Sequence, residues 1–489
     1  MSFLLPNPLP PAARSALPAA TLAASRGYDD YSPVPTTVDI TDSTLTLRRT
    51  HDESGYLIIP WPVEPFGMLA VSSATLRERD EPYRLLVELA RGKLNQVRLQ
   101  TAEWQELGLV TSTQYDRALA EATRLLGRAI HSANPTETDQ LAATALQQAF
   151  QLADQLAHTY IEQLFASRHE EEGLLDTWFA ARHRFAIADA KLERYTECFN
   201  AANVGFRWRD VQPHESHYDW THADSAVAAA VAAGLPITLG PLIDLDPTAL
   251  PEWTRRWEAD LPTLAAFMCD YLETTIHRYK DEVQRWIICA GFNHADALGL
   301  IDDDRLRLAY RLFEAAAQVD SHLDLILSVA QPWGDYLRSE DQTITPLTFP
   351  DDLVRAGVRL AAVEVEIRLG ASTRASLPRD LLDIARLLDV FGRLGPPLEV
   401  VLSIPSAAAA TTSSAAWPLP PSPDQQARWG AAVAALALAW PRVRGLTWEH
   451  WSDADADLTP HSGLLDAAGQ PKPLLTHFAT LRAEHLQNL

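Results

Sequence analysis

The pattern of hydrophobic and polar positions changes character along the chain. Residues 1–35 are rich in Pro, Ala and Ser and lack a continuous apolar run, so we expect a disordered tail there. In residues 36–75, apolar and polar residues alternate roughly every second position, and Pro and Gly interrupt the pattern, which predicts strands. In residues 112–170, apolar residues recur every three or four positions on two segments that meet at an Asn-Pro pair, which predicts two amphipathic helices. We therefore expect a strand-plus-helix region over residues 36–180.

From residue 181 to residue 489, helical segments alternate with short apolar runs, starting with RFAIADA (184–190). Later examples are QRWIICAGFN (284–293) and PPLEVVLSIPS (396–406). Such runs are typical of parallel strands that helices cover on both faces. Seven or eight β/α units fit into this region, which predicts an α/β fold, a (β/α)8 TIM barrel with an N-terminal β-plus-helical attachment. A doubly wound open sheet is the alternative, but no GxGxxG or Walker loop follows any of the apolar runs.

Composition narrows the set of partners. The 489 residues include 41 Lys and Arg against 64 Asp and Glu, a formal net charge of −23. Because a polyanion repels phosphate, we expect no nucleic-acid partner and no anionic-membrane partner. The sequence has no apolar window long enough for a membrane span and no secretory signal pattern, so we expect a cytoplasmic protein. The three cysteines lack CxxC spacing and the histidines are scattered, so we expect no metal site and no cofactor.

Several motifs of the barrel region resemble family 10 glycoside hydrolases, which are xylanase-type retaining enzymes. FRWRDVQPHESHYDW (206–220) is similar to the segment of the family that carries a basic residue and Trp, then Pro, Tyr and Asp. HRYKDEVQRWIICAGFN (277–293) resembles the Arg/Tyr helix end and the Trp that opens the fourth strand. GLTWEHWSD (445–453) and HSGLLDAAGQPKPLL (461–475) resemble the eighth strand and the closing segment. The resemblance implies a carbohydrate partner, bound at the C-terminal face of the barrel.

The catalytic positions of that family are not matched. Retaining hydrolysis uses two carboxyl groups about 5–5.5 Å apart, one as acid/base and one as nucleophile. In the family, one glutamate ends the fourth strand and the other ends the seventh strand. The matching positions in this sequence are Gly291 and Leu402, and no Glu lies within two positions of either. The resemblance therefore implies a glycoside hydrolase fold but leaves the activity open.

Other acidic residues at strand ends offer a relocated catalytic pair. Glu366 takes the place of a family glutamine at the mouth of the barrel, and Glu449 ends the eighth strand. Aromatic side chains nearby could stack on the apolar face of a pyranose. The candidate substrate contacts are Arg207, Trp208, Asp244, Trp333, Asp335, Trp448, Trp451 and Asp453. Trp417, in the low-complexity segment 405–424, is a further candidate on the rim. Alternatively, all of these are hydrogen-bonded rim residues of an inactive barrel.

Three functions thus remain open from the sequence. The chain could hydrolyse a polysaccharide or oligosaccharide with rearranged carboxylates, or bind a carbohydrate without hydrolysing it. It could also act as a structural module whose barrel and N-terminal helices form an assembly surface. Two carboxyl groups about 5–10 Å apart in an open cleft would favour the first function. A cleft filled by the 405–424 segment or by the N-terminal region would favour the third.

Overall fold

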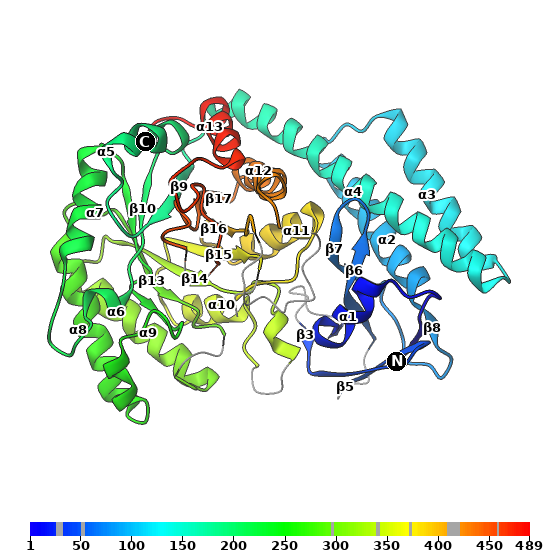
Figure 1. Cartoon of the computed structure of the whole chain (residues 1–489), viewed down its shortest axis with the longest axis horizontal. Coiled ribbons are helices and arrows are strands. Elements are labelled where there is room, and N and C mark those ends of the chain that lie inside the picture. Colours follow the sequence, from blue (N-terminus) through cyan, green and yellow to red (C-terminus); the bar gives the residue numbers. More distant parts are fainter. Residues whose placement is uncertain are drawn as a thin grey trace.

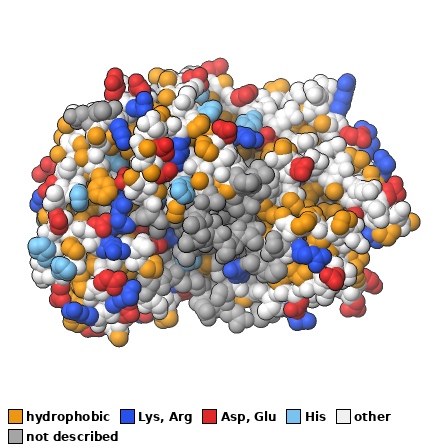
Figure 2. All heavy atoms as spheres, viewed as in Figure 1, with side chains coloured by type: hydrophobic (Ala, Val, Ile, Leu, Met, Phe, Trp, Pro, Cys, Tyr) orange, Lys and Arg blue, Asp and Glu red, His pale blue; other side chains and the backbone are white. Residues whose placement is uncertain are grey.

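The computed structural model describes residues 1–25, 33–49, 54–294, 298–338, 343–370, 374–407, 421–456 and 459–489. Figure 1 shows a barrel surrounded by helices, with a smaller region of strands and helices from the N-terminal part of the chain beside it. On the face drawn in Figure 2, acidic and basic side chains are interspersed, so the net negative charge is not gathered in one patch of this face.

Parallel strands close into a barrel, which confirms the predicted fold class. The barrel strands are β9 (Trp178–His183), β10 (Ala202–Val204), β11 (Ile237–Leu239), β12 (Ile243–Asp244), β13 (Arg285–Ala290), β14 (Asp324–Val329), β15 (Ala362–Arg368), β16 (Leu398–Ser403) and β17 (Val443–Trp448). β12 continues β11 along the chain, β11 pairs with β13, and β17 pairs with β9, so the nine segments form a closed ring of eight strands. The strands are buried throughout except for one residue near the amino end of each of β9, β14 and β17, because helices cover the outside and side chains fill the inside.

Helices return the chain from the carboxyl end of each strand to the amino end of the next. They are α5 (Asp189–Cys198), α6 (Trp208–Val211), α7 (Thr221–Ala232), η1 (Glu252–Trp257), α8 (Leu261–Tyr279), α9 (Asp302–Val319), η2 (Asp335–Arg338), α10 (Thr348–Arg355), α11 (Leu381–Gly392), α12 (Pro423–Ala439) and α13 (Pro473–His485). Their starts carry N-terminal signals. The Ser422 side chain accepts a hydrogen bond from the Gln425 backbone at the start of α12, and α9 begins with three aspartates that suit the positive end of the helix dipole.

The first barrel strand lies earlier in the chain than the sequence pattern suggested. β9 covers WFAARH, whereas the segment 184–190 forms the loop after β9 and the start of α5. Phe185, the apolar residue that made this segment read as a strand, is 40% exposed. The prediction was wrong here because one exposed aromatic residue was counted as part of a buried run.

The expected disordered tail is also wrong for residues 2–25. β1 (Ser2–Leu4) pairs with β5 (Thr44–Arg49) and β8 (Tyr83–Arg84), in one sheet with β4 (Thr36–Ile40). β2 (Leu22–Ser25) joins β3 (Pro33–Val34), β6 (Gly55–Val63) and β7 (Gly67–Ser72) in a second sheet, and α1 (Pro11–Ala20) packs on β6. Phe3 and Leu17 are fully buried, so tertiary packing outweighs the Pro-rich composition of this segment.

The two predicted amphipathic helices are present and tie the N-terminal region to the barrel. α3 (Thr113–His131) and α4 (Pro135–Glu172) pack on α2 (Leu85–Glu106), and the Asn134 side chain caps α4 by accepting from the Thr136 backbone at 3.0 Å. α4 also packs on α11 and α12 of the barrel. Arg168, which is 4% exposed, donates from Nη1 to the backbone oxygen of Leu438 at 2.9 Å. The long helix α4 therefore bridges the two regions, as Figure 1 shows.

Candidate functional site

Ion pairs occupy the inside of the barrel. Arg182 on β9 reaches Glu364 on β15, with 3.4 Å between Nη2 and Oε2, and Arg285 on β13 forms an ion pair with Glu399 on β16. In each case the two strands stand three places apart in the ring, so the side chains meet across the interior. Because side chains two residues apart on a strand share a face, these pairs also show which positions of each strand point inward.

The two candidate catalytic carboxylates lie on either side of one guanidinium group. Arg368 donates from Nη1 to Glu366 Oε2 at 2.5 Å and from Nε to Glu449 Oε2 at 2.8 Å. All three side chains are at most 2% exposed. Burial acts to raise the pKa of Glu449, but the charge of Arg368, its hydrogen bond and the charges of His450 and Arg182 together lower that pKa below its usual value. An ionised, ion-paired carboxylate cannot protonate a leaving group, and a clamped Glu366 is not free to attack a sugar.

One proton is shared deeper in the barrel. Ser328 Oγ lies 2.7 Å from Glu364 Oε1 and 2.8 Å from Glu366 Oε1. A serine hydroxyl has a single proton to donate, so both contacts are hydrogen bonds only when one of the two carboxyl groups is protonated. Burial raises the pKa of Glu364 to about 7, against the opposing charge of Arg182. The shared proton therefore belongs on Glu364, which is 1% exposed and out of reach of a substrate at the mouth.

A guanidinium group fills the space expected for the acid/base glutamate. Gly291 directly follows β13 and has a φ of 74°, the left-handed conformation that favours glycine. A Cβ added at Gly291 would lie 2.1 Å from Nη2 of Arg374. Arg374 is 3% exposed and is paired with Asp244, with 3.2 Å between Nη1 and Oδ2. The end of the fourth strand thus carries no carboxyl group and leaves no space for one at Gly291.

Leu402, the position expected for the nucleophile, lies on the outer face of its strand and not on the face that points into the barrel. Leu402 is fully buried and belongs to the apolar core between the strands and the helices. On β16 the inward positions are those in phase with Glu399, namely Val401 and Ser403. A side chain at 402 therefore points away from the barrel mouth, because a shift of one residue turns a strand side chain to the other face. Neither inward residue at this end of β16 carries a carboxyl group.

Three of the predicted substrate contacts, of which Trp448 and Trp451 were expected to stack on a sugar, are core tryptophans instead. Trp208 and Trp448 are 1% exposed and Trp451 is 4% exposed. Trp208 donates its indole N–H to Gln212 Oε1 at 2.7 Å, and Trp448 donates to the Ser462 backbone oxygen at 2.8 Å. Buried tryptophans whose N–H groups are satisfied inside the protein pack the barrel against its helices. They cannot act as platforms for a sugar ring.

The remaining predicted contacts form ion pairs within the protein. Arg379 donates to Asp335 at 2.8 Å and places its guanidinium 4.4 Å from the ring centre of Trp333. Lys472 donates from Nζ to Asp453 Oδ1 at 2.7 Å. The charges of both aspartates are therefore compensated by protein groups rather than left open for a ligand.

One cavity that the described residues form at the carboxyl end of the barrel is small. Its volume is about 50 Å³, and it is lined by Arg182, Arg184, Gly205, Phe206, Arg207, Pro241, Asp244, Asp246, Thr248, Ala249, Arg368, Glu449, His450 and Asp455. A buried water needs roughly 10–15 Å³ on such a scale. Sites for small molecules measure about 300–1,000 Å³. The cavity thus holds a few waters but not a pyranose, and of the ten candidate residues it gathers Arg207, Asp244 and Glu449. Trp417 and the neighbouring segment 408–420 lie outside the described residues.

Sequence reasoning missed Arg374 and Arg182, whose charges neutralise buried carboxylates inside the barrel. It also missed Phe185. Phe185 follows the carboxyl end of β9 and is exposed, with the Arg184 guanidinium 5.3 Å from its ring centre. Its neighbour Arg184 lines the small cavity. An exposed aromatic ring beside the barrel mouth is a candidate platform for a sugar. The available signal was an aromatic residue two positions after the end of the true first strand. The signal was hidden because the strand was expected six residues later.

Within the described segments, no group of three or more His, Cys, Asp or Glu side chains is placed to hold a metal ion. No helix in the described part of the chain is long and apolar enough to cross a membrane. Cys198, Cys269 and Cys289 are buried free thiols.

Comparisons with known proteins agree with the family resemblance. No protein-family model matches the chain. Endo-1,4-beta-xylanase A from Fusarium oxysporum f. sp. lycopersici is 25% identical over 117 residues, which are 22% of this chain and 35% of the xylanase, so the chain matches about a third of that protein's length.

Solved structures of family 10 enzymes are also similar. Xylanase 10B from Thermotoga maritima is 16% identical, with a TM-score of 0.47 over 63% of this chain and 95% of that chain. GH10 from Paenibacillus barcinonensis is 16% identical, with a TM-score of 0.48 over 63% of this chain and 95% of that chain.

One motif of the resemblance also holds together in space. Arg278 and Tyr279, at the end of α8, both bond to Asp224 on α7, with 2.7 Å between the tyrosine hydroxyl and Oδ1. The sequence match and the motif agree that the barrel of this chain is family 10 glycoside hydrolase-like.

Proposed function

We propose that this chain is a non-hydrolysing, carbohydrate-binding protein built on a glycosidase-like barrel. The observation that carries the proposal is Arg374, whose guanidinium occupies the space beside Gly291 where the acid/base carboxyl would stand. A retaining glycosidase needs one carboxyl group that can give a proton and a second that can attack. The inward residues at the ends of the fourth and seventh strands supply neither.

The relocated pair does not replace them in this proposal. Glu366 and Glu449 are both hydrogen-bonded to Arg368 and buried. Freeing either carboxylate would leave a buried charge without its partner, which costs several kcal/mol. The clamp therefore opposes the movement that a nucleophile or an acid would need.

Carbohydrate binding is assigned to the rim rather than to the closed interior. Phe185 offers an exposed aromatic face, and the nearby Arg184 and Arg207 both bond to Asp210, at 3.2 Å and 2.8 Å. Aromatic faces suit the apolar face of a pyranose, and ionised side chains form strong hydrogen bonds to hydroxyl groups.

A structural role in assembly is the second candidate, favoured by the contacts of the N-terminal region. β7 donates from the Ala70 backbone to the Pro378 oxygen at 2.7 Å, on the loop that follows β15. Lys93 on α2, which is 3% exposed, forms an ion pair with Asp380 at the start of α11. The N-terminal region thus packs on loops at the carboxyl end of the barrel, which is where a glycosidase would admit a polymer.

The test combines binding and hydrolysis on the full chain. Xylan, mannan and glucan oligosaccharides are titrated by calorimetry while reducing ends are measured in the same samples. We expect saturable binding to at least one series without release, and weaker binding after Phe185→Ala. Val231→Ala, which shortens an equally exposed apolar side chain on α7, is the matched control and should leave binding unchanged. Absence of binding to all three series would contradict the proposal and favour the assembly role.

A further inference from the structure

A second pocket opens at the opposite, amino end of the barrel. Its volume is about 430 Å³, and its lining residues are Asp176, Trp178, Arg285, Leu323, Asp324, Arg359, Leu360, Ala361 and Arg444. Trp178, Arg285 and Asp324 open strands β9, β13 and β14. The pocket therefore lies where the strands begin, and it falls in the size range of small-molecule sites, about 300–1,000 Å³.

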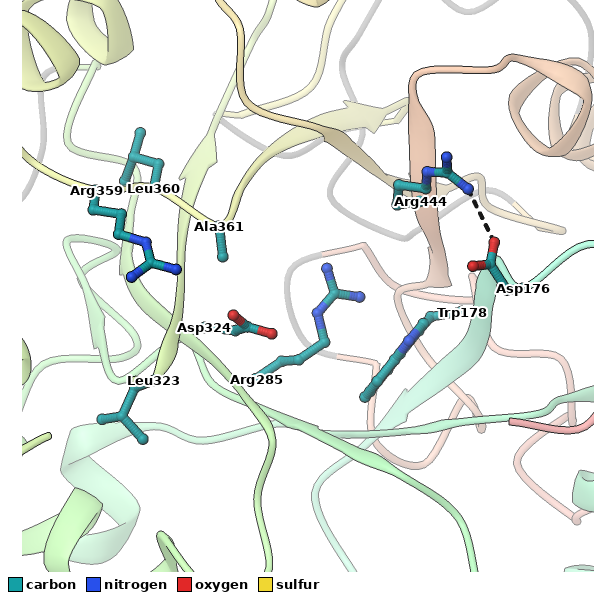
Figure 3. Close-up of a pocket in the computed structure, with 9 residues that line it drawn as sticks. All are labelled: Asp176, Trp178, Arg285, Leu323, Asp324, Arg359, Leu360, Ala361 and Arg444. Carbon is teal, nitrogen blue, oxygen red and sulfur yellow. Dashed lines mark hydrogen bonds and ion pairs between the residues drawn. The ribbon is translucent and has the colours of Figure 1, made fainter. Parts of the chain in front are cut away.

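Three arginines from different elements line this pocket, and Figure 3 shows Arg359 and Arg444 on opposite sides of it, with Arg444 turned toward Asp176. Arg285 is buried, forms an ion pair with Glu399 inside the barrel, and lies over Trp178 with 4.7 Å from its guanidinium to the ring centre. Arg359, in the segment that leads into β15, is exposed at the edge of the pocket. Three guanidinium groups around one hollow are unexpected in a chain of net charge −23.

Much of the hydrogen-bonding capacity of these arginines is unused by the protein. Arg444 donates from Nη1 to Asp176 at 2.9 Å, while its side chain stays 46% exposed. Arg359 forms no ion pair with any of the described residues. Each guanidinium carries five N–H donors, so most of those on Arg359 and Arg444 are available to a ligand. Planar forks of this kind bind carboxylates and phosphates through paired hydrogen bonds.

The acidic residues of the pocket define the rest of the ligand. Asp324 forms no ion pair with the described residues, and in Figure 3 its carboxylate points into the hollow. Asp176 uses one oxygen on Arg444. Carboxylate oxygens accept hydrogen bonds, so a ligand beside them must carry hydroxyl donors as well as its anionic group. A purely anionic ligand such as inorganic phosphate would meet repulsion from Asp324.

We propose that this pocket binds a small hydroxylated oxyanion, of the size of a sugar acid or a sugar phosphate. The anionic group lies against the guanidinium group of Arg359, and the hydroxyl groups face Asp324 and, across the hollow, Arg444. The amino end of such barrels usually serves stability. An arginine that serves only stability would be buried or paired within the protein, as Arg285 is with Glu399, whereas Arg359 is neither.

Calorimetric titration of the full chain at low salt tests this site with named probes. Glucuronate and glucose 6-phosphate carry the two kinds of oxyanion on a hydroxylated ring, glucose is the neutral control, and inorganic phosphate lacks hydroxyl donors on a ring. We expect saturable binding of at least one acidic sugar, weaker or no binding of inorganic phosphate, and no binding of glucose. The acidic sugar that binds more tightly identifies which oxyanion the pocket takes.

Variants place the binding at this end of the barrel. Arg359→Gln and Arg444→Gln change exposed side chains that the fold does not need, and each should weaken binding by about tenfold. Arg355→Gln, an exposed arginine on α10 outside the pocket, is the control and should leave binding unchanged. The proposal is overturned if neither acidic sugar binds saturably, or if binding survives both pocket substitutions. It is equally overturned if binding is lost with Arg207→Gln instead, which would assign the ligand to the other end.

Discussion

The two ends of the barrel contain the same kinds of charged residues but use them differently. At the carboxyl end, Arg368 and Arg374 are buried and closed on carboxylates around a cavity of about 50 Å³. At the amino end, Arg359 and Arg444 stay exposed around a pocket of about 430 Å³. Charged side chains mark a binding site only where their hydrogen-bonding groups are open and the space admits a ligand. By that criterion the described cavity at the carboxyl end does not admit a sugar, whereas the pocket at the amino end admits a small ligand.

The largest effect should come from breaking the clamp at the carboxyl end. Arg368→Ala leaves Glu366 and Glu449 buried without their partner, and we expect a loss of about 3–5 kcal/mol in the free energy of unfolding. Arg124→Ala removes an exposed ion pair with Glu121 and should cost no more than about 1 kcal/mol. Urea unfolding of the three proteins measures both. A cost for Arg368→Ala as small as that of the control would show that the carboxylates are not held as described.

The shared proton predicts a pH dependence of stability. The pKa of Glu364 is raised to about 7 from its ordinary 4.5, so the folded state holds this proton more tightly than the unfolded state. The resulting stabilisation is fully present below pH 4.5 and is lost as the pH rises through 7. Glu364→Gln removes this titration, so the native chain should lose about 1–3 kcal/mol relative to the variant between pH 5 and pH 8. Glu252→Gln, at a 75% exposed side chain, should show no such trend in the same unfolding series.

The contact between Gly291 and Arg374 can be tested by a double-mutant cycle. Gly291→Ala introduces a Cβ against the guanidinium and strains a backbone with positive φ, so we expect a cost of about 1–3 kcal/mol. In an Arg374→Ala background the steric part should disappear and only the backbone part should remain. Equal costs in both backgrounds, measured by chemical denaturation, would mean that Arg374 does not fill this space.

The smallest effect should be at the amino end. Arg359 is exposed and forms no ion pair with the described residues, so Arg359→Ala should change the free energy of unfolding by less than about 0.5 kcal/mol. Comparing the loss in the free energy of unfolding for Arg359→Ala with that for Arg368→Ala distinguishes an arginine that is available to a ligand from one that the fold needs. A loss of several kcal/mol at Arg359 would remove the contrast between the two ends.

The barrel could be predicted from the sequence because its strands are nearly continuous apolar runs of the right length. QRWIICAGFN contains β13, and PPLEVVLSIPS contains β16. The order of residues 2–25 could not be predicted, because Phe3 and Leu17 are buried through contacts with strands that lie much later in the chain. Composition describes a segment by itself, whereas burial depends on what packs against it.

The candidate site was harder to predict than the fold. The loss of the carboxyl groups at Gly291 was visible in the sequence, but its replacement by Arg374 depends on a contact across more than 80 residues. Whether Leu402 points into the barrel or away from it could be decided only once the ion pair between Arg285 and Glu399 showed which face of β16 is the inner one. The fates of Trp208, Trp448 and Trp451 depended on burial alone, since a buried and an exposed tryptophan look the same in a sequence.

The most direct test of the closed carboxyl end is the release of reducing ends from xylan, mannan and glucan oligosaccharides at high protein concentration and over long incubation. The native chain, Glu366→Gln and Glu449→Gln are compared with heat-denatured protein. The account predicts that all of them release no more than the denatured sample. Release by the native chain that is abolished in Glu366→Gln or Glu449→Gln would contradict it, because those carboxylates would then be catalytic despite the clamp of Arg368.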